Sequence, residues 1–237
     1  MAAEQKPNLS VWTRPRRTRE QPALSRAQIV AEAVRLLDAD GLETLSMRNL
    51  GARLGAGATS LYRHVANKDE LIELVVDEVY GEIEIPDPGE DWRAGATACA
   101  HSMRAMILRH PWMASVLGQA GLSYLGPNVI RLNDRMLAVY LAAGFDLLEA
   151  DQALSVVAAY VIGISTSEAA WLTTLARSGQ GEADWAERLR ESATQAMAPY
   201  PRLSELTAAY ERQDQPRDHR FDYGLARILD GLATRLG

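Results

Sequence analysis

A short run of small and polar side chains at residues 58–64 has the composition of a surface that binds duplex DNA. Arg63 can pair with a guanine edge or a phosphate, and Tyr62 and His64 can donate hydrogen bonds to phosphates. The small residues that begin the run suit contact with a thymine methyl group. An alternative role for Tyr62 and His64 is to close the core of a small domain. The candidate DNA contacts in this run are Ala58, Thr59, Ser60, Tyr62, Arg63 and His64.

Six further basic residues are candidates for contacts with the DNA backbone. Arg48 and Lys68 each stand near the start of a predicted helix, where backbone N–H groups also favour a phosphate. Four more arginines occupy residues 1–23, a proline-interrupted segment without helical periodicity, which we predict to be a flexible basic arm. Such an arm either stays solvated or enters the minor groove. Its arginines are Arg14, Arg16, Arg17 and Arg19.

The sequence offers little for catalysis or metal binding. Because Cys99 is the single cysteine, an intrachain disulfide and a cysteine-based structural zinc site are excluded. His101 and His110 are nine residues apart, which is not the spacing of a metal pair on one helix. There is no phosphate-binding glycine motif, nucleophile elbow or His-Glu-x-x-His pattern. We therefore expect no metal, no cofactor and no enzyme activity.

Amphipathic aromatic residues and methionines are frequent in the second part of the chain. They suit a mostly apolar pocket between helices, which would take an apolar small molecule. For each of them, packing in the core is the alternative. The candidate ligand contacts are Met103, Trp112, Tyr124, Met136, Tyr140, Tyr160 and Trp171.

Capping signals predict the helices that position residues 58–64. Ser25, with a glutamine three residues later, has the spacing of a capping box, and Ser46 caps a second, short helix. Asn67, with a glutamate three residues later, begins another helix. Residues 55–57, Gly-Ala-Gly, form a tight turn before residues 58–64. Two short helices joined by such a turn are typical of a helix-turn-helix.

The breaks in the pattern divide the chain into three parts. After the arm of residues 1–23, a three-helix helix-turn-helix domain with its linking fourth helix spans residues 24–84 and ends at Pro86 and Pro88. Residues 90–237 contain helical windows separated by prolines and glycines, without an alternating strand pattern. The predicted fold class is therefore all-α.

Charge is distributed unevenly along a chain whose net charge is −6. Residues 1–64 hold ten basic and six acidic residues, whereas the remainder holds 15 basic and 25 acidic. Only the first part therefore suits contact with DNA. The lack of an apolar leader and of an apolar run of membrane-spanning length predicts a cytoplasmic protein that does not bind a membrane.

Residues 25–83 resemble the DNA-binding domain of TetR-family repressors. The resemblance rests on the run Ser46-Met47-Arg48-Asn49-Leu50 and on the run Thr59-Ser60-Leu61-Tyr62-Arg63-His64-Val65, which Asn67-Lys68 follows. It implies base or phosphate contacts at the helix-turn-helix residues named above. The chain departs from relatives at Thr59, where some carry proline, and at Arg63, where the tetracycline repressor carries tryptophan. The operator sequence therefore cannot be transferred.

The end of the chain is similar to the regulatory domain of the tetracycline repressor. Residues 153–171 look like its long central helix and residues 221–236 like its last helix. In that subgroup these two helices pair with their symmetry mates, which implies a homodimer on a palindrome. Without the resemblance, the apolar stripe of the last helix fits the intrachain core better. The candidate interface residues are Tyr160, Phe221, Leu225, Ile228, Leu229 and Leu232.

These observations predict a dimeric, ligand-responsive transcriptional repressor, whose operator is released when a small apolar or antibiotic-like inducer binds. Residues 116–127 lack the histidine through which tetracycline repressors hold magnesium, which argues against a metal-chelated tetracycline. The alternatives are an activator of the same fold, a helical ligand-binding or scaffold protein without a DNA function, and an all-α enzyme acting on an apolar metabolite.

Overall fold

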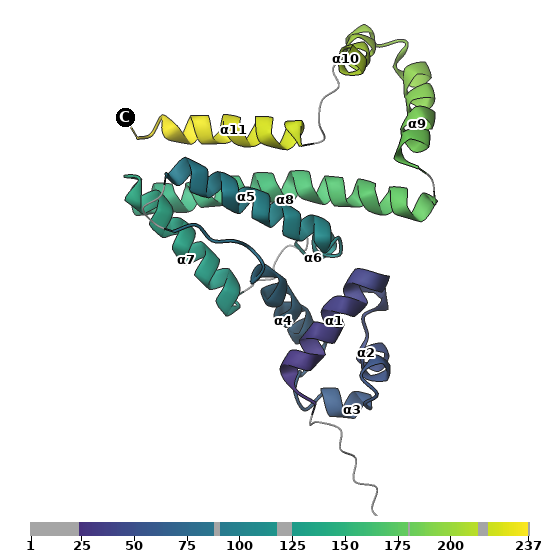
Figure 1. Ribbon diagram of the computed structural model, residues 1–237, viewed down its shortest axis with the longest axis vertical. Helices are drawn as coiled ribbons and strands as arrows, with labels where there is room; N and C mark the ends of the chain where they lie inside the picture. Colours follow the sequence, from purple (N-terminus) through teal and green to yellow (C-terminus); the bar gives the residue numbers. More distant parts are fainter. Residues whose placement is uncertain (1–23, 88–90, 118–124, 180, 213–217, 237) are drawn as a thin grey trace, which may run out of the picture.

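The computed structural model describes residues 24–87, 91–117, 125–179, 181–212 and 218–236, and throughout these residues the regular elements are helical (Figure 1). This confirms the predicted fold class. The elements are α1 (Arg26–Asp40), the 3₁₀ turn η1 (Leu42–Thr44), α2 (Met47–Arg53), α3 (Ala58–Leu61), α4 (Lys68–Tyr80), α5 (Trp92–Arg109), α6 (Met113–Leu117), α7 (Pro127–Ala142), α8 (Leu147–Ser178), α9 (Glu182–Met197), α10 (Pro201–Arg212) and α11 (His219–Ala233).

The helices form two connected groups. At one end, α1 packs against α2 and α4, and α2 packs against α3 (Figure 1). At the other end, the long helix α8 packs against α5, α6, α7 and α11. Helix α4 belongs to both groups, because it packs against α1 on one side and against α5 and α7 on the other. A movement of α4 would therefore affect both groups.

The predicted breaks coincide with helix ends. Helix α5 ends two residues before Pro111, and α7 begins at Pro127. Gly144 and Gly179 have positive φ angles of 105° and 65° and follow α7 and α8, respectively. Glycine adopts this backbone conformation without the steric cost that other residues meet.

The expectation that no segment is long and apolar enough to cross a membrane is wrong for α8. Its 32 residues satisfy that test by length and composition. The tertiary structure gives this helix another role, because Ala153, Val157 and Val161 are buried against the helices around it. Small and β-branched residues raise its hydropathy and also allow close helix packing. Helix α8 is therefore a core helix rather than a membrane span.

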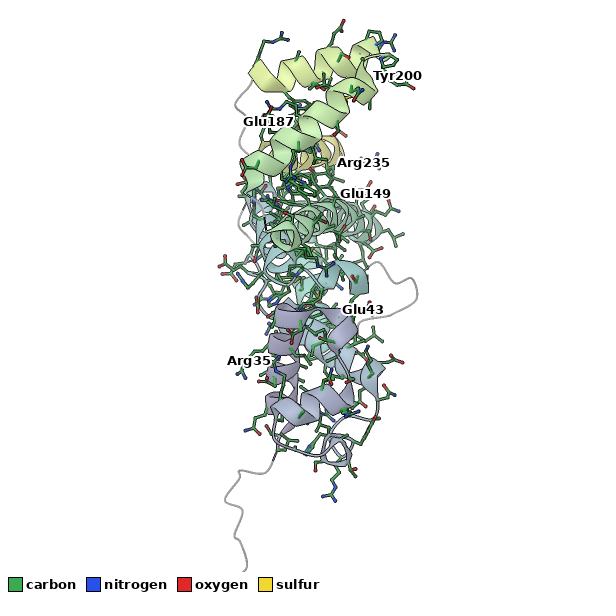
Figure 2. The ribbon with its side chains drawn as sticks, turned by 90° about the vertical axis from the view of Figure 1, so that its right-hand side faces the viewer. Arg35, Glu43, Glu149, Glu187, Tyr200 and Arg235 are labelled. Carbon is green, nitrogen blue, oxygen red and sulfur yellow. The ribbon has the colours of Figure 1, made fainter. Side chains whose placement is uncertain are left out.

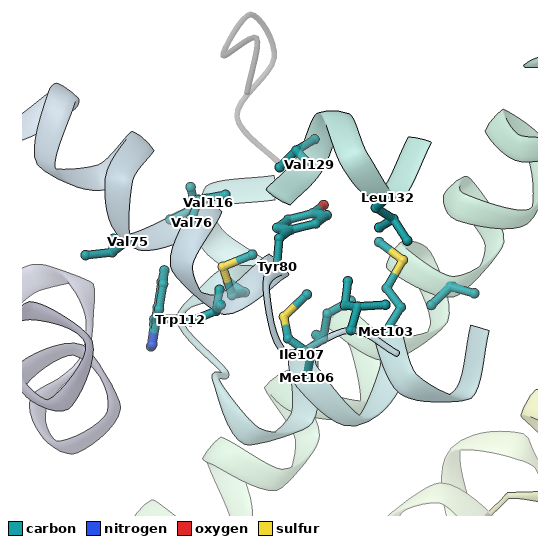
Figure 3. Close-up of a cluster of buried hydrophobic side chains, with 14 of the residues drawn as sticks. Val75, Val76, Tyr80, Met103, Met106, Ile107, Trp112, Val116, Val129 and Leu132 are labelled. Carbon is teal, nitrogen blue, oxygen red and sulfur yellow. The ribbon is translucent and has the colours of Figure 1, made fainter. Parts of the chain in front are cut away.

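A continuous apolar core joins the two groups of helices. Figure 3 shows Val75, Val76 and Tyr80 of α4 near Trp112 and Val129. Within this core Val75 and Val76 have no exposed surface, and Tyr80 is 9% exposed. Close packing of this kind transmits displacement from one element to its neighbours.

Ion pairs hold α11 beside α8 and α5. Arg104 of α5 is buried and donates to Glu168 of α8 at 2.9 Å and to Asp218, which precedes α11, at 2.7 Å. Arg235, just after α11, pairs with Glu149 near the start of α8. The side view of Figure 2 shows α9 and α10 at one end of a narrow molecule, opposite the helix-turn-helix.

Candidate DNA-binding surface and ligand cavity

Side-chain caps define the ends of the helices around the predicted DNA-binding run. Ser25 and Gln28 form a complete capping box at the start of α1. The Ser46 hydroxyl accepts from the backbone N–H of Asn49, and the Asn67 side chain accepts from that of Glu70 at 2.8 Å. These bonds satisfy N–H groups that a helix start otherwise leaves without a partner, so the local sequence determines where each helix begins.

Gly51 allows α2 and α3 to approach each other closely. A Cβ atom built at this position would lie 2.8 Å from the carbonyl oxygen of Ala56 and 3.5 Å from Leu61. The backbone N–H of Ala56 donates back to the carbonyl of Gly51 at 2.9 Å. The turn is therefore closed by backbone contacts that leave no room for a side chain at residue 51. The sequence alone does not predict this role of Gly51, because a glycine inside a helix carries no turn signal.

Several of the predicted DNA contacts lie in residues 58–64, which we call the reading segment. Most of their side chains project into solvent. Leu61 and Val65 are buried and hold the segment to the core, whereas Tyr62 is 52% exposed. Thr59, Ser60 and Arg63 are also exposed. The regular part of α3 is shorter than the segment 58–64, since it ends at Leu61 and continues as a turn. The alternative that Tyr62 fills the core is inconsistent with its exposure.

The flanking residues lie around the same surface. Arg48 and Lys68 are exposed at the first turns of α2 and α4, while Ala58 and His64 are half-buried. The Nε atom of Arg26 donates to the carbonyl oxygen of His64 at 3.3 Å and so connects α1 to the turn after α3. The four arm arginines, Arg14, Arg16, Arg17 and Arg19, lie outside the described residues.

A cavity of about 140 Å³ lies between α4, α5, α7 and α8. Its described lining comes from 15 residues, and most of the lining surface is apolar. Asn133, an exposed residue, stands at the rim of the cavity, and Tyr80 contributes a wall from the end of α4. The lining is Tyr80, Ala96, Cys99, Ala100, Met103, Val129, Leu132, Asn133, Met136, Tyr140, Leu154, Val157, Ala158, Val161 and Ile162.

Burial keeps two of the ionisable side chains that line the cavity, those of Cys99 and Tyr140, neutral over the physiological pH range. Burial raises the pKa of the Cys99 thiol to about 11. Burial, with a smaller contribution from the nearby Cys99, also raises the pKa of Tyr140. The Tyr140 ring lies 6.0 Å from that of Trp92 and 5.6 Å from that of Phe145, and its buried hydroxyl has no hydrogen-bond partner among the described residues.

A polar cluster around the buried side chains of His110 and Trp112 connects the helix-turn-helix to the cavity-bearing helices. The Nδ1 atom of His110 lies 2.7 Å from Asp38 at the end of α1, and its Nε2 atom lies 3.2 Å from Glu82, just beyond α4. The indole N–H of Trp112 donates to the same Asp38 oxygen at 2.8 Å. This cluster was missed because its members are far apart in sequence. Within the described parts of the chain, no group of three or more His, Cys, Asp or Glu is placed to hold a metal ion.

Comparison with known families matches both parts of the chain. Residues 29–75 match the family model described as bacterial regulatory proteins, tetR family. Residues 85–236 match the model described as tetracyclin repressor-like, C-terminal domain. The chain belongs to the TetR family.

Relatives of this TetR-family chain match it over most of its length. An HTH-type transcriptional regulator of Saccharopolyspora erythraea is 35% identical, with 96% of this chain and 93% of the relative covered. The HTH-type transcriptional repressor DrrR1 of Streptomyces coeruleorubidus is 34% identical over 90% of this chain and 78% of its own. The tetracycline repressor class A of Escherichia coli is 30% identical, with 87% and 89% covered.

Solved structures of TetR-family proteins share the fold. Streptomyces coelicolor ActR in complex with actinorhodin has a TM-score of 0.75 and 29% identity, and the match covers 90% of this chain and 97% of ActR. BioQ with its double-stranded DNA operator has a TM-score of 0.62 and 23% identity, with 89% and 99% covered, and supports the fold alone. As a member of the TetR family, this chain is a DNA-binding transcriptional regulator.

Of the seven residues predicted to contact a ligand in this TetR-family chain, Met103, Met136 and Tyr140 line the cavity. Three others lie elsewhere. Trp112 is buried in the His110 cluster, Tyr160 donates to the backbone carbonyl of Phe221 at 2.9 Å, and Trp171 packs against Trp185 of α9. These three predictions are wrong for the cavity, because amphipathic aromatics also serve as packing residues with one polar anchor. Tyr124 lies outside the described residues.

The apolar stripe of α11 serves mainly the intrachain core of this TetR-family fold. Phe221, Leu225 and Leu229 are at most 2% exposed, because they pack on α8 within one chain. Ile228 and Leu232 are half-buried at the edge of this contact. The prediction that the whole stripe faces a partner is therefore wrong for the three buried residues. Helical spacing marks a buried face without showing which chain buries it.

Proposed function

We propose that a homodimer of this chain presents two α3 segments to successive major grooves of a palindromic operator. The candidate base contacts are exposed Thr59, Ser60, Tyr62 and Arg63, with Ala58 and His64 beside them. Arg48 and Lys68 contact the flanking phosphates, and the arm of residues 1–23 adds further phosphate contacts through its arginines. Phosphate contacts position the protein, and base contacts give it sequence specificity.

The main support for this proposal is the exposure of polar side chains on the segment 58–64. Leu61 within it and Val65 directly after it are buried and hold it against the neighbouring helices. Tyr62 is 52% exposed although it lies beside fully buried Leu61. A large aromatic side chain that is exposed beside the basic residue Arg63 suits a phosphate-lined groove better than open solvent.

The dimer interface that we propose uses the outward sides of α8 and α11. Along α8 the exposed positions recur at helical spacing, and small residues dominate them, which permits close approach of a second helix. On α11, Tyr223 is 62% exposed, and Ile228 and Leu232 are half-buried at the edge of the contact with α8. Tyr160 of α8 lies at the contact between α8 and α11, where its hydroxyl donates to backbone carbonyls of α11. The exposed positions on the outward side of α8 include Val156, Ala159, Gly163, Ser167 and Ala170.

The inducer in this proposal occupies the cavity between α4, α5, α7 and α8. Tyr80 lines that cavity and belongs to α4, whose other end leads directly from α3. A ligand that pushes on Tyr80 would shift α4 and change the separation of the two reading segments. A coupling of about 1–3 kcal/mol changes DNA affinity roughly 5- to 150-fold. The complex of the similar ActR with actinorhodin supports a small-molecule ligand for this fold.

Three further assignments belong to the same proposal. The helix-turn-helix domain spans residues 24–84 and the ligand-binding and dimerisation domain spans residues 90–237. The protein acts in the cytoplasm, where its DNA target lies. It regulates transcription without catalysing a reaction, since the described part of the cavity lining contains no nucleophile beside an activating base.

Fluorescence anisotropy with duplex DNA from the flanks of the chain's own coding region tests the proposal. At low salt, we expect specific binding that weakens as salt rises. Arg63→Ala should weaken it about tenfold or more, the loss expected for a bidentate base contact. The matched control is Arg135→Ala, which removes an exposed charge from α7. No binding at low salt, or equal losses in both variants, would contradict the assignment and favour a ligand-binding protein without a DNA function.

A further inference from the structure

We propose that the inducer is an electrically neutral, mainly apolar molecule that accepts one hydrogen bond from the Tyr140 hydroxyl inside the cavity. This inference rests on the proposed function, because it specifies the ligand of the same cavity. It adds two properties that the fold does not determine: the charge of the ligand and the atom that anchors it.

The described lining of the cavity carries no charged side chain. None of the 15 lining residues is Asp, Glu, Lys, Arg or His. A charged ligand that entered would lose its hydration without meeting a partner of opposite charge, and that cost is far larger than the cost for a neutral molecule. The described walls therefore select against carboxylates, phosphates, ammonium groups and metal-chelated anions.

Tyr140, a residue of the cavity wall, has a hydroxyl without a hydrogen-bond partner among the described residues. This residue has no exposed surface. Buried hydroxyls normally have a partner. The ring cannot easily turn the hydroxyl elsewhere, because Trp92 and Phe145 contact it edge-on or at a tilt. A carbonyl or ether oxygen of a ligand would supply the missing acceptor.

Tyr140 and Cys99 both keep their protons inside the cavity. The pKa of Tyr140 is raised by burial, so the hydroxyl keeps its proton and donates. The Cys99 thiol, with a pKa of about 11, is also protonated and is a poor nucleophile. The ligand is therefore held reversibly, with the thiol as a soft packing surface rather than a point of covalent attachment.

The size of the cavity links occupancy to the switch. A volume of about 140 Å³ accommodates a group of about one aromatic ring. A larger ligand must displace part of the wall, and the part that α4 contributes is Tyr80. Figure 3 shows Tyr80 among the apolar side chains that join α4 to the other helices. Extension of the ligand beyond one ring thus pushes on the helix that leads to α3.

Three probes of nearly equal shape separate charge from hydrogen bonding: 2-acetylnaphthalene, which is neutral and has a carbonyl, 2-ethylnaphthalene, which lacks an acceptor, and 2-naphthoate, which is an anion. Affinities for the full-length protein are measured by calorimetry. We expect 2-acetylnaphthalene to bind at least about tenfold more tightly than 2-naphthoate, because the carboxylate loses its hydration.

Tyr140→Phe tests the anchor without changing the shape of the cavity. It should lower the affinity ratio of 2-acetylnaphthalene to 2-ethylnaphthalene about fivefold to tenfold, the contribution of one neutral hydrogen bond. Tyr160→Phe is the matched control, because its hydroxyl donates to backbone carbonyls outside the cavity, and it should leave the ratio unchanged. Thermal melting checks that both variants fold.

The outcomes distinguish this inference from the proposed function. Binding of 2-naphthoate as tight as that of the ketone, an unchanged ratio in Tyr140→Phe, or binding of none of the three probes would overturn the inference even if the protein binds its operator. Selective, Tyr140-dependent binding of the ketone by a protein that ignores DNA would support the inference and overturn the proposed function.

Discussion

The DNA-binding surface and the cavity differ in where their polar groups lie. On the helix-turn-helix, the polar side chains are exposed and short apolar anchors such as Leu61 lie beneath them. In the cavity, one hydroxyl, that of Tyr140, is buried among apolar side chains without a partner. A surface that reads a highly charged polymer benefits from many solvated donors, whereas a pocket for a small molecule gains specificity from one desolvated donor.

The surfaces also differ in how far the chain must fold to create them. Residues 48–68 contain every described DNA candidate, whereas the cavity draws on residues 80–162 from four helices. Helix α4 and the His110 cluster connect the two. Substitutions that affect one surface and leave the other intact therefore test whether the two parts are separable.

The largest effect should come from Gly163→Leu on the outward side of α8. A Cβ at Gly163 meets nothing within 4 Å in the single chain, so the fold should be preserved. A leucine would block close packing by a second α8, and loss of two-site binding should weaken operator affinity about 100-fold or more. Sedimentation and anisotropy measure the two effects. Ala142→Leu, at an exposed position of α7, is the control, and a Gly163→Leu variant that stays dimeric would refute the proposed interface.

Gly51→Ala should damage the reading surface and spare the cavity. The added methyl group would overlap the carbonyl oxygen of Ala56, and overpacking of this kind costs about 1–3 kcal/mol. We expect a lower melting temperature and weak DNA binding, with ligand affinity unchanged. Gly57→Ala provides the comparison, because nothing lies within 4 Å of a Cβ there and its φ is −70°. Equal stability of the two variants would show that the α2–α3 approach tolerates a side chain.

Loss of the His110 link should reduce stability by a comparable or smaller amount. His110→Ala leaves Asp38 and Glu82 without their shared partner and should lower the free energy of unfolding by about 1–3 kcal/mol. If the cluster holds the two parts together, calorimetry should show broader or separate transitions. Ser115→Ala, an exposed change on neighbouring α6, should leave a single transition at the original temperature. An unaltered melting curve for His110→Ala would mean that the apolar core alone joins the two parts.

The smallest effect concerns alkaline pH and belongs to the cavity alone. Burial raises the pKa of Cys99 from 9.0 to about 11, so the unfolded chain loses the thiol proton at a lower pH than the folded chain. This group's contribution to stability is complete below pH 9 and is lost as the pH rises from about 9 to about 11, by roughly 2 kcal/mol. Cys99→Ala should flatten that part of the denaturation profile, while operator binding at pH 7 is unchanged. Identical profiles for the two proteins would contradict the burial of the thiol.

Much of the helix-turn-helix was predictable, because its signals are local. Ser25, Ser46 and Asn67 cap the helices through bonds to residues three positions away, and Tyr62 and Arg63 are exposed because buried Leu61 determines the orientation of the segment. The role of Gly51 was not predictable, because it depends on how closely α2 and α3 approach each other. The sequence predicted a mostly apolar pocket between helices, but it did not predict most of the residues that line the cavity. Three of its candidate residues line it, and three others turned out to be packing residues in other contacts.

The sequence by itself determined the helices, their ends and the polar face of the reading segment, because capping and helical periodicity act over three or four residues. Only the tertiary structure decided which apolar residues enclose a cavity, which chain covers Phe221 and Leu225, and which carboxylates meet His110. These outcomes depend on contacts between residues tens of positions apart. Amphipathic helices of similar composition can pack in many ways, and the choice among them is made by the fit of whole surfaces rather than by any local pattern.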